Sequence, residues 1–278
     1  MMYEIRNLEN IGFEDLADTW NSAFCDYIVP MNMTVEGLCA YFKVAGVDRS
    51  QSFGAFYNNA LVGMLLNSVD TFRGERTAYD AMTGIVPQHR GKGLFTRLFE
   101  HTKNSLKSNG IKNYYLEVIK TNENAYSIYK NKGGKICREF SCIYGRIDNK
   151  FEGVVEVKVS PLSDFTVSET ELSVYEPSWS NRLVSLHRNI DDYQVAYIEG
   201  GKRKVAAIFN KWSGGIPQIM FNGIDDKDLL RAVFICLSQK FDSLSISNIP
   251  STETELINEL LNIGFKVLVE QYEMKIDL

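Results

Sequence analysis

The sequence has few of the residues on which several classes of protein depend. Its five cysteines form no Cys-x-x-Cys pair, and an odd number cannot all be paired within one chain. Free thiols are typical of a reducing compartment, so we expect a cytoplasmic protein. Only three histidines occur, far apart and without metal-ligand spacing, so we expect no bound metal and no histidine-based triad.

Long apolar runs and an excess of basic charge are also missing. No apolar stretch approaches the roughly 20 residues that a membrane span needs, and the first residues lack the apolar segment of a secretory signal. The formal net charge of −5 does not favour a nucleic-acid binder. With 45% hydrophobic and 23% charged residues, the chain can bury a core. We therefore expect a globular protein without membrane or nucleic-acid partners.

Hydrophobic periodicity predicts an α/β order in the N-terminal half. Thr34 is a predicted N-cap, Asn58-Asn59 a tight turn, and Gly91 and Gly93 precede an amphipathic helix. The predicted helices are 14–26, 34–45, 94–108 and 122–132, and the predicted extended segments are 52–57, 60–69, 79–86, 111–119 and 135–147.

The C-terminal half repeats this order at an offset of 131 residues, which indicates an internal duplication. The predicted elements are a helix at 178–188, a hairpin of 195–198 and 205–209 turning at Gly200-Gly201, a strand at 216–221, a helix at 229–240, a strand at 244–249 and a helix at 255–262. We predict two tandem units, 1–148 and 149–278, joined near Asn149 to Gly153. Two domains of unrelated fold are the alternative.

The most informative segment is a basic glycine loop, Gln88-His89-Arg90-Gly91-Lys92-Gly93. Glycines let the backbone approach a ligand closely, and the first amides of the following helix point outward and favour an anion. Residues 84–135 contain ten basic and three acidic residues. Solvated helix faces would explain that charge, and a polyanionic small ligand is the other interpretation.

Other phosphate-binding motifs fit this loop less well. A Walker loop requires Ser or Thr after Lys92, where this chain has Gly93. A dinucleotide fingerprint requires a glycine at Thr96.

A second motif, Asn122-Glu123-Asn124-Ala125-Tyr126-Ser127-Ile128-Tyr129, begins 34 residues after Gln88. With both motifs in this order, residues 3–147 resemble the GNAT superfamily of acyl-CoA-dependent N-acetyltransferases, whose loop reads Gln/Arg-x-x-Gly-x-Gly/Ala. The chain departs from the family pattern at Phe95, at Ala125, which is shifted by one residue, and at Gly134, where the family has Phe.

The resemblance implies a mixed sheet flanked by helices, with the strands at 79–86 and 111–119 splayed apart. The pantetheine arm of acetyl-CoA would lie in the gap and pair with the backbone of Ile85 and Val86, with Asn122 beside it. The pyrophosphate would lie on residues 88–94, namely Gln88, His89, Arg90, Gly91, Lys92, Gly93 and Leu94.

The resemblance also implies direct acetyl transfer to a primary amine of a small molecule or peptide. Tyr129 matches the position of the acid that protonates the leaving thiolate, and a phenol stays protonated at neutral pH. Glu117 and Asp80 flank the gap as candidate bases or acceptor contacts. The residues in the family's acceptor-side segment are Trp20, Phe24, Asp26 and Tyr27. Packing in the core is the alternative role for these aromatic residues.

In the second unit the same positions have lost this chemistry. Asp225, Asp226 and Asp228 stand where the loop would hold phosphates, and Leu260 and Glu253 correspond to Tyr129 and Asn122. We expect this unit to bind no acyl-CoA and to pack against the first unit, shape the acceptor pocket or form a homodimer face.

Two other functions are compatible with the sequence. One is a non-catalytic acyl-CoA-binding sensor or scaffold, favoured by Phe95, Gly134 and the altered second unit. The other is a nucleotide-binding regulator, which lacks a Mg²⁺-binding hydroxyl after Lys92.

Overall fold

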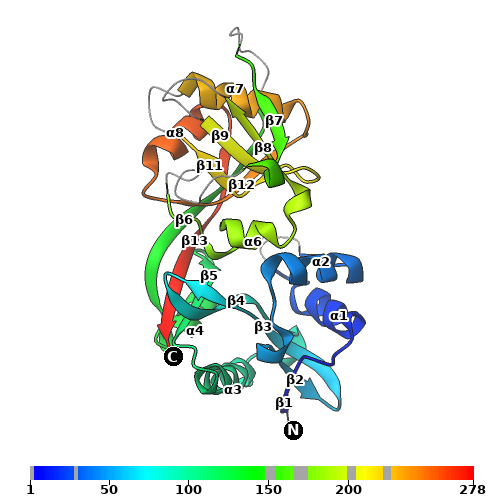
Figure 1. Ribbon diagram of the computed structural model, residues 1–278. Coiled ribbons are helices and arrows are strands. Elements are labelled where there is room, and N and C mark those ends of the chain that lie inside the picture. The colour runs from blue at the N-terminus through cyan, green and yellow to red at the C-terminus, as the bar shows by residue number, and fades with distance from the viewer. Residues whose placement is uncertain (1–2, 28–30, 148–154, 166–174, 199–204, 222–226) are drawn as a thin grey trace. The chain divides into compact units, whose positions relative to one another are not determined.

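The computed structural model describes residues 3–27, 31–147, 155–165, 175–198, 205–221 and 227–278 (Figure 1). Contacts divide the chain into two compact units. Unit 1 comprises Met1–Glu117, Lys130–Lys135 and Met274–Leu278, and unit 2 comprises Val118–Tyr129 and Ile136–Glu273. These units differ from a simple cut between residues 148 and 149, so that domain boundary stays a prediction.

The sheet of unit 1 has the strand order β1-β2-β3-β4-β5. The pairs are antiparallel except for β4 and β5, which run parallel. Asn58 and Asn59 turn the β2–β3 hairpin with φ of 48° and 65°, as predicted for this tight turn. The strands are β1 (Glu4–Asn7), β2 (Phe53–Tyr57), β3 (Ala60–Phe72), β4 (Glu75–Ile85) and β5 (Asn113–Ile119).

Three helices accompany this sheet: α1 (Phe13–Ala23), α2 (Val35–Ala45) and α3 (Leu94–Ser108). The predicted cap of α2 is confirmed, because the Thr34 hydroxyl accepts the Gly37 amide at 3.0 Å. Helices α1 and α2 share a core with Met64 and Met82, whereas Leu94 of α3 packs in a separate cluster with Val62. The helices thus bury different parts of the sheet (Figure 1).

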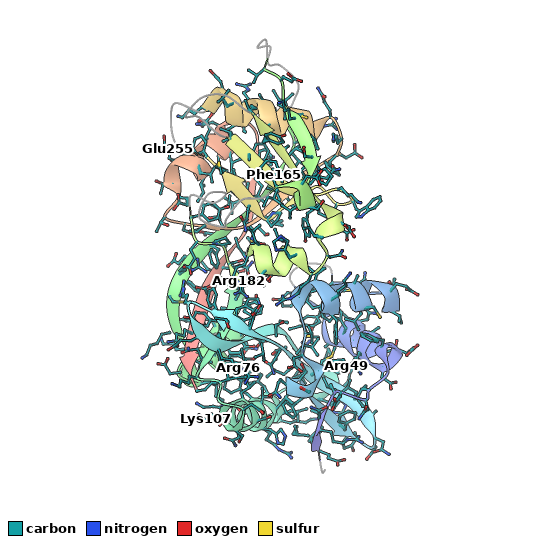
Figure 2. All side chains as sticks on the ribbon, in the orientation of Figure 1. Arg49, Arg76, Lys107, Phe165, Arg182 and Glu255 are labelled. Carbon is teal, nitrogen blue, oxygen red and sulfur yellow. The ribbon has the colours of Figure 1, made fainter. Side chains whose placement is uncertain are left out.

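Polar contacts fasten the connections around this core. The Arg49 guanidinium donates to the carbonyls of Leu8 and Ile11 (Figure 2). Arg76, at the start of β4, donates to the carbonyl of Asn109, just after α3, at 3.2 Å. These contacts satisfy carbonyls that no sheet or helix ladder would satisfy.

The parallel pairing of β4 with β5 is short. It runs only from Thr77–Asn113 to Tyr79–Tyr115, although both strands continue. On its other side β4 pairs with β3 through Ile85, with a bulge: Met82 faces Leu66 and Asp80 faces Asn67, so Ala81 is the extra residue. The predicted splay between β4 and β5 is therefore present, and it begins beside this bulge.

The strands of unit 2 follow the order β13-β6-β12-β10, which is part of a nine-stranded sheet, and the order β11-β9-β8-β7, which is a four-stranded sheet. The strands are β6 (Lys135–Gly145), β7 (Lys158–Pro161), β8 (Tyr193–Ile198), β9 (Val205–Asn210), β10 (Gly215–Ile216), β11 (Gln218–Met220), β12 (Leu244–Pro250) and β13 (Lys266–Asp277). The α-helices are α4 (Glu123–Asn131), α6 (Leu183–His187), α7 (Lys227–Ser238) and α8 (Thr254–Asn262).

The predicted repeat is visible in the element bounds. Adding 131 to the bounds of β5 gives those of β12, and the same step carries α4 onto α8. β6 and β13 both begin at matching residues, Lys135 and Lys266. These matching bounds support the predicted internal duplication.

The strands β1, β7 and β13 were not predicted, and two predicted elements differ in the structure. The strand expected over 216–221 is broken into β10 and β11 at Pro217, which lacks an amide hydrogen for a ladder. The helix expected over 178–188 is a 3-10 turn, Trp179–Asn181, followed by α6. Arg182, labelled in Figure 2, lies between them and is extended. Its guanidinium lies over the Trp179 ring at 4.2 Å. The predicted junction 149–153, the Gly200-Gly201 turn and residues 222–226 lie outside the described residues.

We expect Met274→Ala to destabilise unit 1 although it lies in the last strand. Met274 is fully buried and belongs to unit 1, and a buried Met→Ala change costs about 2–5 kcal/mol. The measurement is the urea-unfolding free energy of the full-length protein. Leu268→Ala, on the same strand and 54% exposed, is the control and should cost less than about 1 kcal/mol. Equal losses would contradict the assigned burial.

Candidate functional site

The glycine loop connects the C-terminal end of β4 to α3. Pro87–His89 forms a 3-10 turn, and Gly91 and Gly93 then adopt φ of 71° and 68°. Only glycine takes this left-handed conformation without strain. No atom lies within 4 Å of where a Cβ would stand at either glycine, so the main chain is open to a ligand.

The amides after this turn are available to bind an anion. His89 and Arg90 donate to the carbonyls of Val86 and Pro87. Among the described residues, nothing accepts a hydrogen bond from the amides of residues 91–94. Gly93 begins α3 without a side-chain cap, so the positive end of the helix dipole adds to these amides.

Arg90 forms contacts within the protein, and its predicted contact with the pyrophosphate stays a prediction. Both terminal nitrogens of its guanidinium donate to the Asp26 carboxylate, at 2.7 and 2.9 Å. It also donates to the carbonyls of Ala23 and Ile85. The Arg90 bond, ahead of the pair's Coulomb attraction, lowers the pKa of Asp26. Arg90 therefore ties the loop to the end of α1.

Lys92 and His89 differ in charge. The Lys92 ammonium lies over the loop and donates to the Gln88 carbonyl at 2.8 Å. His89 packs against Tyr3 and Tyr57, and its Nδ1 is 3.0 Å from the Tyr3 hydroxyl. Burial, and then the charge of Lys92, lowers the pKa of His89. Lys92 rather than His89 supplies positive charge to this loop at neutral pH.

The remaining predicted cofactor residues line the same segment. Leu94 is buried in the core at 2% exposure and anchors the first turn of α3. The Val86 amide donates to the Val62 carbonyl on β3. The Ile85 carbonyl accepts from Arg90. Ile85 and Val86 therefore have fewer backbone groups left to pair with the pantetheine than the resemblance implied.

Two carboxylates flank the start of the splay. Asp80 is the first residue of β4 beyond the last pair with β5, and both its oxygens lie within 2.9 Å of the Thr83 hydroxyl. Glu117 is on β5, two residues beyond the last pair, and is half-buried. The pair register places Glu117 across the gap from Ala81.

Sequence reasoning missed Tyr41, whose hydroxyl donates to the Ala81 carbonyl at 2.5 Å. Burial raises the pKa of Tyr41, and the negative charges of Asp80 and Glu117 raise it further, so the phenol stays a donor. Thr83 was missed too. Neither residue has a signal in the sequence, because the bulge whose carbonyl Tyr41 binds forms only when β3 and β4 pair.

The acceptor-side residues differ in exposure. Trp20 is 1% exposed, and its indole donates to the Met31 carbonyl at 2.7 Å, so its place is in the core. Phe24 and Tyr27 are half-buried and in edge contact with each other. The Phe24 ring lies against Gly84 of β4, where any side chain would collide with it.

The second motif lies in unit 2. Asn122 caps α4, because its side-chain oxygen accepts the Ala125 amide at 3.1 Å. Tyr129, on the last turn of α4, is buried at 8% exposure. Its acid role stays a prediction from the motif.

The second copy replaces Glu117 with Asn248, 131 residues later. Asn248 is buried at 5% exposure and has a left-handed φ of 56° at a bulge of β12. Its amide donates to the Ser178 hydroxyl at 3.0 Å, and its oxygen accepts from Cys142 and Gln271. A hydrogen-bonded amide thus fills the place of the carboxylate.

Within the part of the chain that is described, no three or more His, Cys, Asp or Glu side chains are grouped to hold a metal ion. Over the same residues, no helix has both the length and the apolar character needed to cross a bilayer.

Comparisons with known proteins agree with this geometry. Residues 4–133 match the model of the acetyltransferase (GNAT) family. The chain is 34% identical over 88 residues to N-alpha-acetyltransferase 30 of Schizosaccharomyces pombe, covering 31% of this chain and 57% of that protein. The chain spans little more than half the length of the curated relatives it matches.

Two solved structures match nearly the entire fold. A putative acetyltransferase from Pyrococcus horikoshii aligns with a TM-score of 0.69 at 12% identity, over 99% of this chain and 89% of that one. A GCN5-related N-acetyltransferase from Sphaerobacter thermophilus aligns with a TM-score of 0.69 at 13% identity, over 99% and 95%. At these identities the matches show the fold of both halves.

We expect Arg90→Lys to loosen the glycine loop, because an ammonium cannot reproduce the forked contact with Asp26 and the two carbonyl bonds. Amide hydrogen exchange at His89 and at residue 90, the loop amides that are hydrogen-bonded, should quicken by about tenfold, the effect of losing roughly 1.4 kcal/mol of local stability. Lys107→Arg, a charge-conserving change in the exposed last turn of α3, is the control and should leave the loop unchanged. Unaltered exchange in Arg90→Lys would show that the contacts of Arg90 with Asp26 and the two carbonyls do not hold the loop.

Proposed function

We propose, from the match of residues 4–133 to the model of the acetyltransferase (GNAT) family, that the protein is an acetyl-CoA-dependent N-acetyltransferase. The acceptor is a primary amine of a small molecule or of a peptide. Direct transfer joins the amine nitrogen to the acetyl carbon and breaks the carbon–sulfur bond, so that coenzyme A leaves as the thiol.

The observation that carries the proposal is the row of open amides at residues 91–94. They lie at an uncapped helix start, beside Lys92, immediately after the strand that parts from its neighbour. A diphosphate carries the charge that this end of a helix favours. Gln88, His89 and Arg90 shape the turn, and Lys92 supplies the full positive charge.

The pantetheine arm of the donor is proposed to lie where β4 and β5 separate. Beyond Tyr79 and Tyr115 the facing edges of β4 and β5 are no longer paired with each other, so an extended arm with amide groups can pair there as a strand would. Asn122 remains our candidate for contact with the pantetheine through its amide nitrogen, since its oxygen caps α4.

The proposed chemistry divides the protons between two groups. Tyr129, at the family's position in the second motif, donates its phenolic proton to the departing thiolate. Glu117 is the candidate base that takes the proton from the attacking amine. The base assignment rests on its place at the mouth of the splay.

The relatives support an amine acceptor without fixing its identity. N-alpha-acetyltransferase 30, by its name, acts on α-amino groups, and its match covers 31% of this chain. Fold and donor loop do not determine an acceptor.

We propose that the second half binds no acyl-CoA. Its sequence has three aspartates at the loop position, Leu260 replaces Tyr129, and Asn248 replaces Glu117. Leu260 is fully buried in an apolar cluster and offers no proton. The work of this half is then to support the first, whether by packing, by shaping the acceptor pocket or as a homodimer face.

We expect Tyr129→Phe to lower kcat by about 100-fold or more with an amine substrate, because the thiolate loses its proton donor. The affinity for acetyl-CoA should stay the same. Thiol release during a screen of amines measures the activity. Tyr126→Phe, on the same helix, is the matched control. Full activity in Tyr129→Phe would remove the acid role, and acetyl-CoA binding without turnover of any amine would favour the sensor or scaffold alternative.

Calorimetric titration of the full-length chain with acetyl-CoA should give one site per chain. The repulsion between three aspartates and a diphosphate leaves the second loop position empty. A stoichiometry of two would contradict the loss of function in the second half.

A further inference from the structure

The parallel strand pairs of the two halves stop at equivalent residues. In the first half, β4 and β5 last pair at Tyr79 and Tyr115. In the second half, β10 and β12 last pair at Ile216 and Ile246, and Ile246 lies 131 residues after Tyr115. The strands of the second half therefore separate where those of the first half do. We call the place beyond Ile216 and Ile246 the second gap.

The 3-10 turn Trp179–Asn181 bridges the two flanks of the second gap. On one flank, the side-chain amide of Gln218, the first residue of β11, donates to the Asn181 carbonyl at 2.5 Å. On the other flank, the side-chain amide of Asn181 donates to the Ser247 carbonyl of β12 at 2.9 Å. One residue of the turn thus accepts a hydrogen bond from one strand and donates a hydrogen bond to the other.

A second hydrogen bond lies beside this bridge. Asn248, at the bulge of β12, donates from its side-chain amide to the Ser178 hydroxyl at 3.0 Å. Ser178, Asn181, Gln218 and Asn248 are each at most 6% exposed. Buried polar groups need hydrogen-bond partners, and here the two strands and residues 178–181 supply them to one another. Residues 178–181 are therefore bonded to both flanks of the second gap.

The turn is also anchored on its own side. Trp179 is 1% exposed, so the turn cannot leave the second gap without exposing a large apolar ring. The Trp179 carbonyl accepts from the Ser185 hydroxyl at 2.8 Å and from the Arg182 guanidinium at 3.2 Å. These contacts fix residues 178–181 as a part of the core.

The bonds made by Asn181 are of the kind that a pantetheine arm would make. An extended arm with amide groups offers carbonyl acceptors and N–H donors to the edges of strands. In the second gap, Asn181 supplies one acceptor to Gln218 and one donor to Ser247. An incoming arm would have to break both of these bonds before it could pair there.

Building on the proposed function, we propose that residues 178–181 permanently occupy the second gap and thereby exclude the pantetheine arm of an acyl carrier from the second half. This exclusion does not depend on charge. The second half therefore rejects an uncharged arm as well as a complete carrier, and the aspartates at its loop position are a separate obstacle.

Pantetheine is the probe that separates occupation from charge repulsion, because it carries no phosphate. The full-length protein is titrated with pantetheine, and amide hydrogen exchange is followed at residues 245–249. In the wild type, pantetheine should leave the exchange of these residues unchanged. Slower exchange there would overturn the proposal, since it would show that an uncharged arm enters the second gap.

A weakened bridge should admit the probe. Asn181→Ala removes the amide that binds Ser247, so pantetheine should slow exchange at residues 245–249 by about tenfold. Gln218→Ala removes the bond on the other flank and gives the same test if Asn181→Ala does not fold. Asn258→Ala, on the exposed face of α8, is the matched control and should behave as the wild type. A folded bridge variant without this slowing would contradict the proposal.

The effect of charge is tested separately with acetyl-CoA. Replacing Asp225, Asp226 and Asp228 together by Asn removes the repulsion and retains residues 178–181, so calorimetry should give the same stoichiometry as the wild type. An additional site would overturn the proposal.

Exchange at residues 113–119 reports the donor in the first half. If acetyl-CoA gives no protection there, the proposed function fails, and the pantetheine result at residues 245–249 in the bridge variants still decides the occupation of the second gap.

Discussion

The bulge at Ala81 is the feature on which the rest of the N-terminal unit depends. It interrupts the regular pairing of β4 with β3, and just before it the bonds between β4 and β5 stop at Tyr79 and Tyr115. A strand with an unpaired edge would normally invite another strand. Tyr41 holds the bulged carbonyl, so the open edge is maintained by the protein itself. The proposed binding of the donor depends on this opening.

The charged side chains of the glycine loop divide into structural and functional ones. Arg90, which lies in the middle of the loop motif, is committed to Asp26 and two carbonyls and holds the loop against α1. Lys92 remains over the loop surface. In the second half the same fold persists without these features. Pro217 breaks the strand equivalent to β4, and Asn248 is tied into hydrogen bonds where Glu117 stands in the first half. The matching element bounds in the two halves therefore accompany different residues at the equivalent positions.

Local signals in the sequence were sufficient for the elements and for the loop. The helix over 94–108 was predicted with its observed bounds, and the 131-residue offset matches β5 to β12 and α4 to α8, because periodicity and glycine positions are local properties. The contacts that decide the site are not local. Arg90 and Asp26 are 64 residues apart and Tyr41 and Ala81 are 40 apart, so no spacing in the sequence announces them. Trp20 was assigned to acceptor binding by resemblance, whereas its burial places it in the core.

The central claim is that an acyl carrier lies in the opening beside Ala81 with its diphosphate on the amides of residues 91–94. A crystal structure of the full-length protein grown with acetyl-CoA tests this most directly. The account predicts density for the diphosphate at those four amides and for the pantetheine between the parted ends of β4 and β5. Density for the carrier elsewhere, or an opening filled by the protein's own side chains, would contradict it.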